Sequence, residues 1–215
     1  MERLVLLPVP WKNEHENWKK LHAFRFSIHA GKKPNGIQRT PSCVRLQELH
    51  HWLLSQDGMM KDSPLAFVHA DDESGNGIEA IKDIPSGEIL WKIPTSCILS
   101  TKTYASKNNP MQQLLSVDPL LQAFPTSALA LCVLYESSDT SQFFYPYVAA
   151  LPGCVFGPCY FSQADWDAIN VTTAGTEAHA VFYHSIKQYF YLKNKVISIL
   201  PSFSLESYLW GKLYI

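Results

Sequence analysis

The spacing of apolar residues changes about one hundred residues into the chain. Before that point the apolar residues form short runs interrupted by Pro and Gly, and after it they recur every three or four residues. Short runs bounded by turn residues predict β-strands, whereas a spacing of three and four predicts helices that bury one face. The chain is therefore expected to be an α+β protein, with its strands in the first half and most of its helices in the second.

The first half is expected to begin with a helix over residues 42–57. Ser42 can cap its first turn, and Gly58 can end it. Leu46 and Leu53 belong to an apolar stripe at helical spacing. Four short strands are expected to follow and to form a small β-meander. These strands are predicted at residues 65–68, 78–84, 88–93 and 97–99.

Capping residues mark two helices in the second half. Thr126 or Ser127 can cap a helix that runs through Tyr135. The segment from Ser162 to Asp165 has the S-x-x-D form of a capping box, which predicts that another helix begins there.

Two more helices are predicted from apolar spacing. The first covers residues 177–199 and is ended by Pro201, and the last begins near Ser204 and continues to Ile215. The apolar face of the long helix is expected to consist of Ala178, Phe182, Ile186, Tyr189 and Phe190. On the last helix, Leu205, Leu209 and Leu213 recur four apart and are expected to pack onto polypeptide beyond this chain.

Composition narrows the function classes. Apolar residues make up 47% of the 215 residues and charged residues 17%, which is enough to bury a core. The net charge of −1 provides no global field for nucleic acid or an anionic membrane, and no run of ~18 apolar residues exists. Neither nucleic acid nor a membrane is therefore expected as a partner.

The N-terminal segment and the cysteines bear on location. Residues 1–41 carry eight basic and three acidic residues, a net charge of +5, and are expected to be a disordered tail. A transit peptide is the alternative, and the three glutamates argue against it. The five cysteines are scattered and form no C-x-x-C pair, so neither a metal site nor a disulfide framework is predicted. An intracellular location in cytoplasm or nucleus is expected, with a plastid as the alternative.

A glycine-rich segment is the strongest candidate for chemistry. Residues 75–80 match G-x-G-x-x-A, the dinucleotide-binding fingerprint, which requires a helix directly after it. Pro85 follows too soon for a long helix, so a strand is predicted instead and the dinucleotide interpretation is rejected. Gly75 and Gly77 still let the main chain approach a ligand closely, although a simple β-turn explains them equally well.

The other polar residues give no catalytic constellation. His179 and His184 are five apart, whereas a helical metal pair needs a spacing of four, and no G-x-S-x-G elbow occurs. No catalytic or metal-binding residue is therefore assigned from the residues alone.

The order of several short motifs resembles that of the Rubisco large-subunit methyltransferase-like SET-domain proteins, which include protein-lysine and actin-histidine methyltransferases. Residues 75–84 are similar to the family's G-x-G-hydrophobic-x-A-x-x-D-I, and residues 86–90 to its G-E-x-L. The resemblance covers about residues 43–215. Further matching segments are Trp52-Leu53, 93–94, 129–131, 144–148, 151–152 and 207–210.

The resemblance implies an architecture and a site. The tail at 1–41 would precede a partial SET-domain β-sheet region at 42–100 and an all-helical iSET insertion at 101–215. It implies an S-adenosylmethionine-dependent protein-lysine N-methyltransferase acting on a protein substrate. The cofactor would be cradled by Ser74, Gly75, Asn76 and Gly77. Ser74 stands where the family usually has a glutamate, and Glu73 lies one place earlier.

Elements that the family places later are absent from these 215 residues. They are an Arg, an Asn-His pair that contacts the cofactor, and a Tyr in the transfer channel. The resemblance therefore implies that this chain alone binds S-adenosylmethionine weakly or not at all and is inactive. The alternatives are a segment of a protein-histidine (actin-type) N-methyltransferase, a non-enzymatic protein-binding adaptor, and a truncated product without function.

Overall fold

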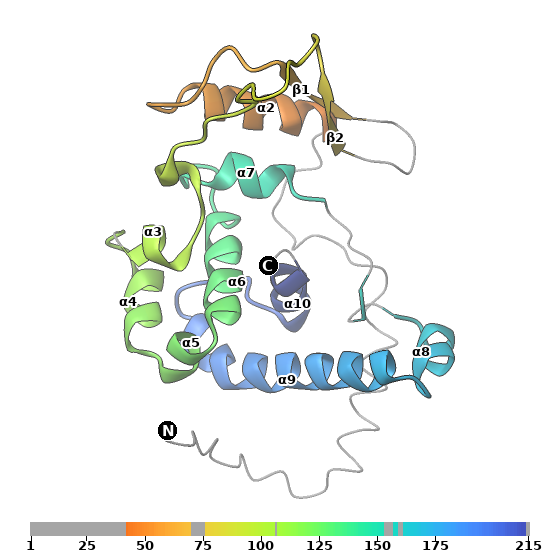
Figure 1. Ribbon diagram of the computed structural model, residues 1–215. Coiled ribbons are helices and arrows are strands. Elements are labelled where there is room, and N and C mark those ends of the chain that lie inside the picture. The colour runs from red at the N-terminus through yellow and green to blue at the C-terminus, as the bar shows by residue number, and fades with distance from the viewer. Residues whose placement is uncertain (1–41, 70–75, 106, 153–156, 159–160, 214–215) are drawn as a thin grey trace, which may run out of the picture.

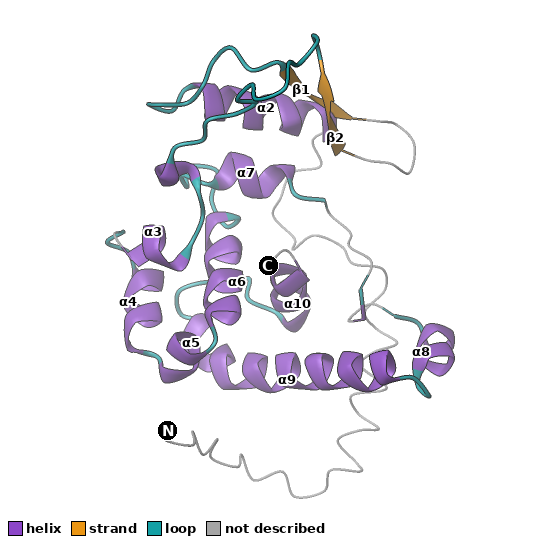
Figure 2. Cartoon of the chain, in the orientation of Figure 1, coloured by secondary structure: helices purple, strands orange, loops and turns teal. Residues whose placement is uncertain are grey.

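The computed structural model describes residues 42–69, 76–105, 107–152, 157–158 and 161–213. Helices dominate these residues, and the two strands lie together at one end of the molecule (Figure 2). The predicted tail at residues 1–41 lies outside the described part. The α+β class is confirmed, because a small sheet is joined to a mostly helical body.

The end with the strands is built from one helix and one hairpin. Helix α2 (Ser42–Leu54) ends three residues before the predicted limit, and β1 (Leu65–His69) pairs antiparallel with β2 (Asn76–Ala80). The His50 ring of α2 meets the Phe67 ring of β1 edge-on at 5.6 Å between centroids, so α2 covers the inner side of β1. The whole of β2 is exposed.

The predicted four-stranded meander is wrong in its second half. Residues 88–93 form no strand in the structure, because they do not join the sheet of β1 and β2, and two of their carbonyls bond instead to the segment before β1. The Lys92 carbonyl accepts from the Met60 amide at 3.1 Å, and the Leu90 carbonyl accepts from the Ser63 hydroxyl at 2.8 Å. Residues 95–97 form the short 3-10 helix η1 (Thr95–Cys97) rather than the start of a strand.

Helices form the rest of the described chain (Figure 1). The central helix is α6 (Pro125–Glu136), most of whose side chains are buried. Short helices lie along one side of α6, α7 lies between α6 and α2, and α9 crosses the opposite end. The remaining elements are α3 (Thr101–Ala105), α4 (Pro110–Val117), α5 (Pro119–Ala123), α7 (Tyr145–Ala150), α8 (Gln163–Ile169), α9 (Thr173–Val196) and α10 (Leu205–Leu213).

The last helix belongs to the core of this chain. Leu205 and Leu209 are buried, as are Tyr208 and Trp210, because α10 packs on α6. A Cβ atom on Gly211 would lie 3.1 Å from the Ala130 carbonyl oxygen, so glycine permits this close approach. The prediction that Leu205 and Leu209 pack onto polypeptide beyond the chain is therefore wrong, and Leu213 is half-buried.

The predicted helix starts have mixed outcomes. The capping box is confirmed: the Ser162 hydroxyl accepts from the Asp165 amide, and the Asp165 carboxylate accepts from the Ser162 amide. The predicted cap of α6 is wrong, because the helix begins at Pro125 and no side chain caps it. Instead, the Ser127 hydroxyl donates to the Gln188 side chain at 3.0 Å and ties α6 to α9.

The long helix is confirmed, with α9 beginning four residues earlier than predicted. The Thr172 hydroxyl caps it by accepting from the Gly175 amide at 3.0 Å. Four of the five predicted apolar-face residues are buried, but Phe190 is exposed. At 100° per residue Phe190 is turned away from the buried face, so its inclusion was wrong.

Cys132 on α6 should resist thiol reagents in the folded protein. It is fully buried, and this burial, with the Glu136 carboxylate nearby, raises the pKa of the thiol to about 12. The thiolate is the form that reacts with alkylating reagents, and with this pKa almost no thiolate exists at pH 8. Alkylation followed by peptide mapping should find Cys43, which is exposed, labelled within minutes and Cys132 unlabelled until denaturant is added. Equal labelling of both would contradict the packing of α6.

Candidate functional site

The glycine-rich segment connects the two strands of the hairpin. Ser74 and Gly75 lie outside the described residues, whereas Asn76 and Gly77 are the first residues of β2. The prediction that a strand follows the glycines is confirmed, because β2 runs to Ala80 and the chain then turns toward Pro85. This backbone does not offer the helix N-terminus that a dinucleotide pyrophosphate requires.

The Asn76 side chain connects the hairpin with the helical part. Its Oδ1 lies 2.8 Å from His69 Nδ1, at the facing position of β1, and its Nδ2 donates to the Ala150 carbonyl at 3.5 Å. Because the amide nitrogen points to Ala150, Oδ1 is the acceptor and the His69 ring donates to it. The end of α7 is thereby held against the start of β2.

The main chain at Gly77 is open to solvent. Gly77 faces Val68 across the hairpin, and a Cβ atom placed on it would lie 3.6 Å from the Val68 Cγ2 atom, an ordinary van der Waals distance. The residue is exposed, as is all of β2. The main chain at Gly77 is therefore exposed and has no side chain of its own to cover it.

His69 and Ala150 were missed by the sequence analysis. Ala150 lies 74 residues from Asn76, and no local pattern signals the contact between a strand and a distant helix end. His69 carries a signal, because a hairpin across residues 70–75 pairs position 69 with position 76. Of the four predicted cofactor contacts, the structure describes two, Asn76 and Gly77, and places them next to each other.

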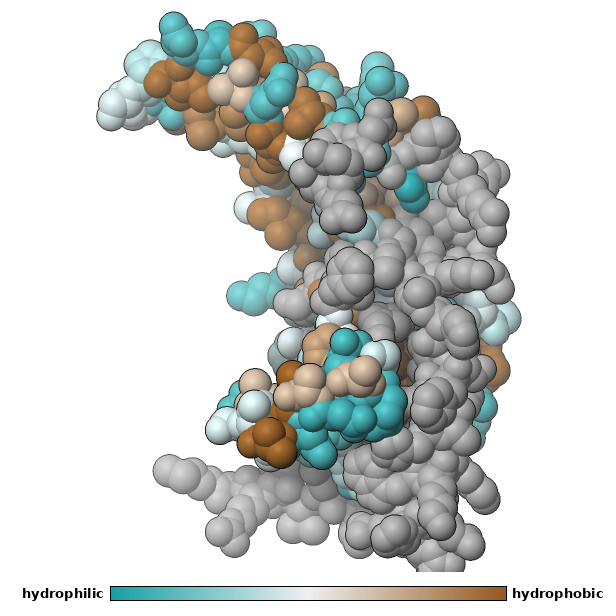
Figure 3. Space-filling view, turned by 90° about the vertical axis from the view of Figure 1, so that its right-hand side faces the viewer, coloured by the Kyte–Doolittle hydropathy of each residue, from teal (hydrophilic) through white to brown (hydrophobic). Residues whose placement is uncertain are grey.

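Large apolar side chains are exposed at several positions in the hairpin and the loops that follow it. Seven large apolar side chains between residues 78 and 98 are exposed. Figure 3 shows hydrophobic residues among the polar ones at the end of the molecule that carries α2 and the strands. They are Ile78, Ile81, Ile84, Ile89, Leu90, Ile93 and Ile98.

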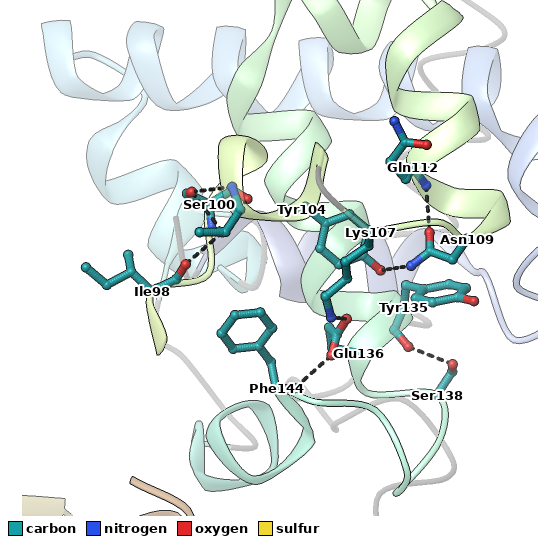
Figure 4. A network of polar contacts seen from close by, with 11 residues as sticks. Ile98, Ser100, Tyr104, Lys107, Asn109, Gln112, Tyr135, Glu136, Ser138 and Phe144 are labelled. Atoms are coloured by element: carbon teal, nitrogen blue, oxygen red, sulfur yellow. Dashed lines mark hydrogen bonds and ion pairs between the residues drawn. The ribbon is translucent and has the colours of Figure 1, made fainter. Parts of the chain in front are cut away.

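The most deeply buried carboxylate lies in the helical part. Glu136 is fully buried, and its two oxygens accept from the Lys107 ammonium and the Phe144 amide, both at 2.8 Å (Figure 4). The Lys107 ammonium also lies 5.0 Å from the centre of the Tyr104 ring. Burial, with this carboxylate, raises the pKa of Tyr104 well above its usual value. Because every strong hydrogen-bonding group here has a partner, the network is structural.

Other polar groups suggest no further site. The described residues contain no group of three His, Cys, Asp or Glu side chains placed to bind a metal ion. Within the same residues no helix combines the length and apolar character needed to span a membrane. His179 packs its ring on Trp166 at 4.1 Å between centroids, which agrees with a packing role for that histidine.

Sequence comparison finds relatives among methyltransferases. The chain is 29% identical over 148 residues to an actin-histidine N-methyltransferase of Dasypus novemcinctus, covering 65% of this chain and 25% of that protein. It is 28% identical over 82 residues to the protein SET DOMAIN GROUP 40 of Arabidopsis thaliana, covering 38% of this chain and 16% of that protein. No family model matches the chain. The chain spans about a quarter of the length of the actin-histidine enzymes it matches.

Solved structures with the same fold are Rubisco LSMT complexes. One is bound to sinefungin and monomethyllysine, with a TM-score of 0.67 over 80% of this chain and 39% of that chain. Another is bound to AdoMet, with a TM-score of 0.66 over 80% of this chain and 39% of that chain. Both are 16% identical in sequence, so they establish the fold.

Proposed function

The chain has the SET-domain methyltransferase fold of the Rubisco LSMT type, and from this premise we propose that it is part of an S-adenosylmethionine-dependent protein N-methyltransferase. Its residues 74–77 would form one wall of the cofactor site. The observation that carries the proposal is the exposed backbone at Gly77, held beside the end of α7 by the Asn76 side chain. A related fold bound to AdoMet supports the same cofactor.

Three residues of the turn have a defined task in this proposal. The main chain of Gly75 and Gly77 approaches the cofactor, which no side chain at Gly77 obstructs. Asn76 fixes the turn by its bonds to His69 and Ala150. The bound cofactor supplies an electrophilic methyl group on its sulfonium. The protein must hold a neutral nitrogen of the acceptor in line with that methyl group.

The exposed apolar surface supports a site that further polypeptide completes. Seven large apolar side chains are exposed within a stretch of twenty-one residues, and exposed apolar groups that gather in one region favour contact with further polypeptide. In the proposed enzyme, polypeptide that packs on residues 78–98 would also close the cofactor site opposite the turn. The division into a SET part at 42–100 and a helical insertion at 101–215 remains part of this proposal.

The acceptor is a lysine or a histidine of a protein substrate. The family resemblance implied lysine, with histidine as the alternative, and one neighbouring structure holds monomethyllysine. The second candidate is histidine, favoured by the higher sequence identity, 29% against 16%, to actin-histidine enzymes. The predicted intracellular location stays a prediction.

Replacing Gly77 with Ala should separate binding from folding. The new methyl group would meet only Val68 at an ordinary distance, and alanine restricts the unfolded chain, so the free energy of unfolding should change by only about 0.5 kcal/mol. Binding of S-adenosylmethionine should weaken at least ~10-fold, because the methyl group occupies the approach to the backbone. Thermal unfolding and a binding titration measure the two effects. Glu79→Ala, on the same strand, is the control, and equal loss of binding in both variants would contradict the assignment.

A chimera tests the function as a whole. Residues 42–213 would replace the matching region of an actin-histidine N-methyltransferase, and radiolabelled methyl transfer to histidine and lysine peptides would be measured. We expect transfer to one of the two peptides, lost on Gly77→Val. A folded chimera that binds no S-adenosylmethionine would instead favour a non-enzymatic protein-binding adaptor.

A further inference from the structure

The long helix α9 carries an unusual outer surface at the end of the molecule remote from the hairpin (Figure 1). Its inner side packs into the core through Phe182, Ile186 and Tyr189. The outer α9 face is defined here by residues that share one side of the helix and its last turn: Lys187, Phe190, Tyr191, Asn194 and Ile197.

Large apolar groups lie exposed on the outer α9 face. Phe190 is 49% exposed, Tyr191 39% and Ile197 43%. Phe190 and Tyr191 are adjacent, and Ile197, the C-cap residue of α9, follows Phe190 by seven positions, so the three lie within about two turns at the end of the helix. An exposed phenylalanine and isoleucine at this spacing resemble the anchors with which one helix packs on a partner.

The charged side chains of the segment that carries this face are all basic. Residues 178–205 contain Lys187, Lys193 and Lys195 and no Asp or Glu. Asp118, a buried residue at the start of α5, pairs with Lys195 at 2.6 Å and neutralises it. Among the described residues, no other ion pair involves a lysine of α9. Lys187 and Lys193 are therefore two exposed positive charges beside the apolar groups.

A surface that combines apolar groups with unbalanced positive charge fits a complementary partner. Apolar side chains of that partner would cover Phe190 and Ile197, and its carboxylates would face Lys187 and Lys193. The phosphates of a nucleic acid could pair with the lysines, but a nucleic acid has few apolar groups to pack against an isoleucine. The chain also has no Arg after Arg45 to bind phosphates in the bidentate way that nucleic-acid surfaces favour.

We propose that the outer α9 face docks an acidic amphipathic segment of a partner protein. This docking surface is separate from residues 74–77 and does not depend on the proposed methyl transfer. It adds an anchoring contact far from the candidate cofactor turn.

The test uses a fluorescent helical peptide of about 18 residues, or about five turns, with leucines on one side and glutamates on the other. Fluorescence anisotropy measures its binding to the full 215-residue chain. We expect the double variant Lys187→Glu, Phe190→Ser to bind at least ~10-fold more weakly. Both positions are exposed, and circular dichroism verifies that the variant is folded.

A matched variant locates the binding. Ile89→Ser with Lys92→Glu makes the same kind of change on the other apolar surface, where both side chains are exposed. This variant should change the affinity for the acidic peptide by less than ~2-fold. A control peptide with lysines in place of the glutamates should bind the unmodified chain at least ~10-fold more weakly than the acidic peptide does. The proposal would be overturned if the acidic peptide did not bind, or if the two double variants lost affinity for it equally. It would also be overturned if duplex DNA at equal concentration displaced the acidic peptide.

Discussion

Replacing Lys107 with Met should lower the free energy of unfolding by about 3 kcal/mol, because it leaves a buried carboxylate without its cation. Glu136 is fully buried, and the Lys107 ammonium is its charged partner at 2.8 Å. The Phe144 amide remains bonded to the carboxylate, but one neutral donor cannot offset the desolvation of a full charge. The loss should appear in urea denaturation followed by circular dichroism.

A second substitution tests the reason for this loss. In the double variant Lys107→Met, Glu136→Gln the buried charge is removed together with its partner, while the amide oxygen still accepts from Phe144. This variant should recover at least ~1 kcal/mol relative to Lys107→Met alone. If the two variants were equally unstable, the cost would come from lost packing of the lysine chain against its aromatic neighbours and not from the buried charge.

Replacing Trp210 with Ala should cost about 3–5 kcal/mol, the range for removing a fully buried large aromatic side chain. Trp210 is completely buried on α10, and its indole nitrogen donates to the Pro152 carbonyl at 3.4 Å. Trp210→Phe keeps most of the volume and loses the hydrogen bond, so it should cost about 1–2 kcal/mol. Equilibrium denaturation in urea compares the two.

The stability loss of Trp210→Ala tests whether α10 packs in the core of this chain. If α10 packs on α6 as the structure has it, Trp210→Ala cannot be accommodated without a cavity in the centre of the helical part. A loss below ~1 kcal/mol would instead mean that α10 is only loosely attached to α6 in this chain.

Local signals predicted the elements that depend only on neighbouring residues. The capping box from Ser162 to Asp165 needs two side chains and two amides within four residues, and it forms as predicted. The strand after Gly77 follows from Pro85 and the apolar run before it. The fold and its likeness to SET-domain methyltransferases were predicted from the order of such local motifs.

Contacts between distant segments were not predictable in the same way. Residues 88–93 have the composition of a strand, but their carbonyls bond to Met60 and Ser63. Leu205 and Leu209 form a regular stripe whether their partner is α6 or another polypeptide, so the spacing alone assigned the wrong partner. The bond from Asn76 to Ala150 depends on how α7 meets the hairpin, which no residue near Asn76 encodes.

The central claim is that residues 74–77 contact S-adenosylmethionine, and an NMR titration of the 15N-labelled 215-residue chain tests it most directly. The account predicts weak binding, with a dissociation constant of ~1 mM or about −4 kcal/mol, because the four residues of the turn would supply only part of the contacts to the cofactor. Amide shifts should centre on Gly75, Asn76 and Gly77 and should vanish in Gly77→Ala. Shifts centred on other residues, with none at Gly75, Asn76 and Gly77, would contradict the claim.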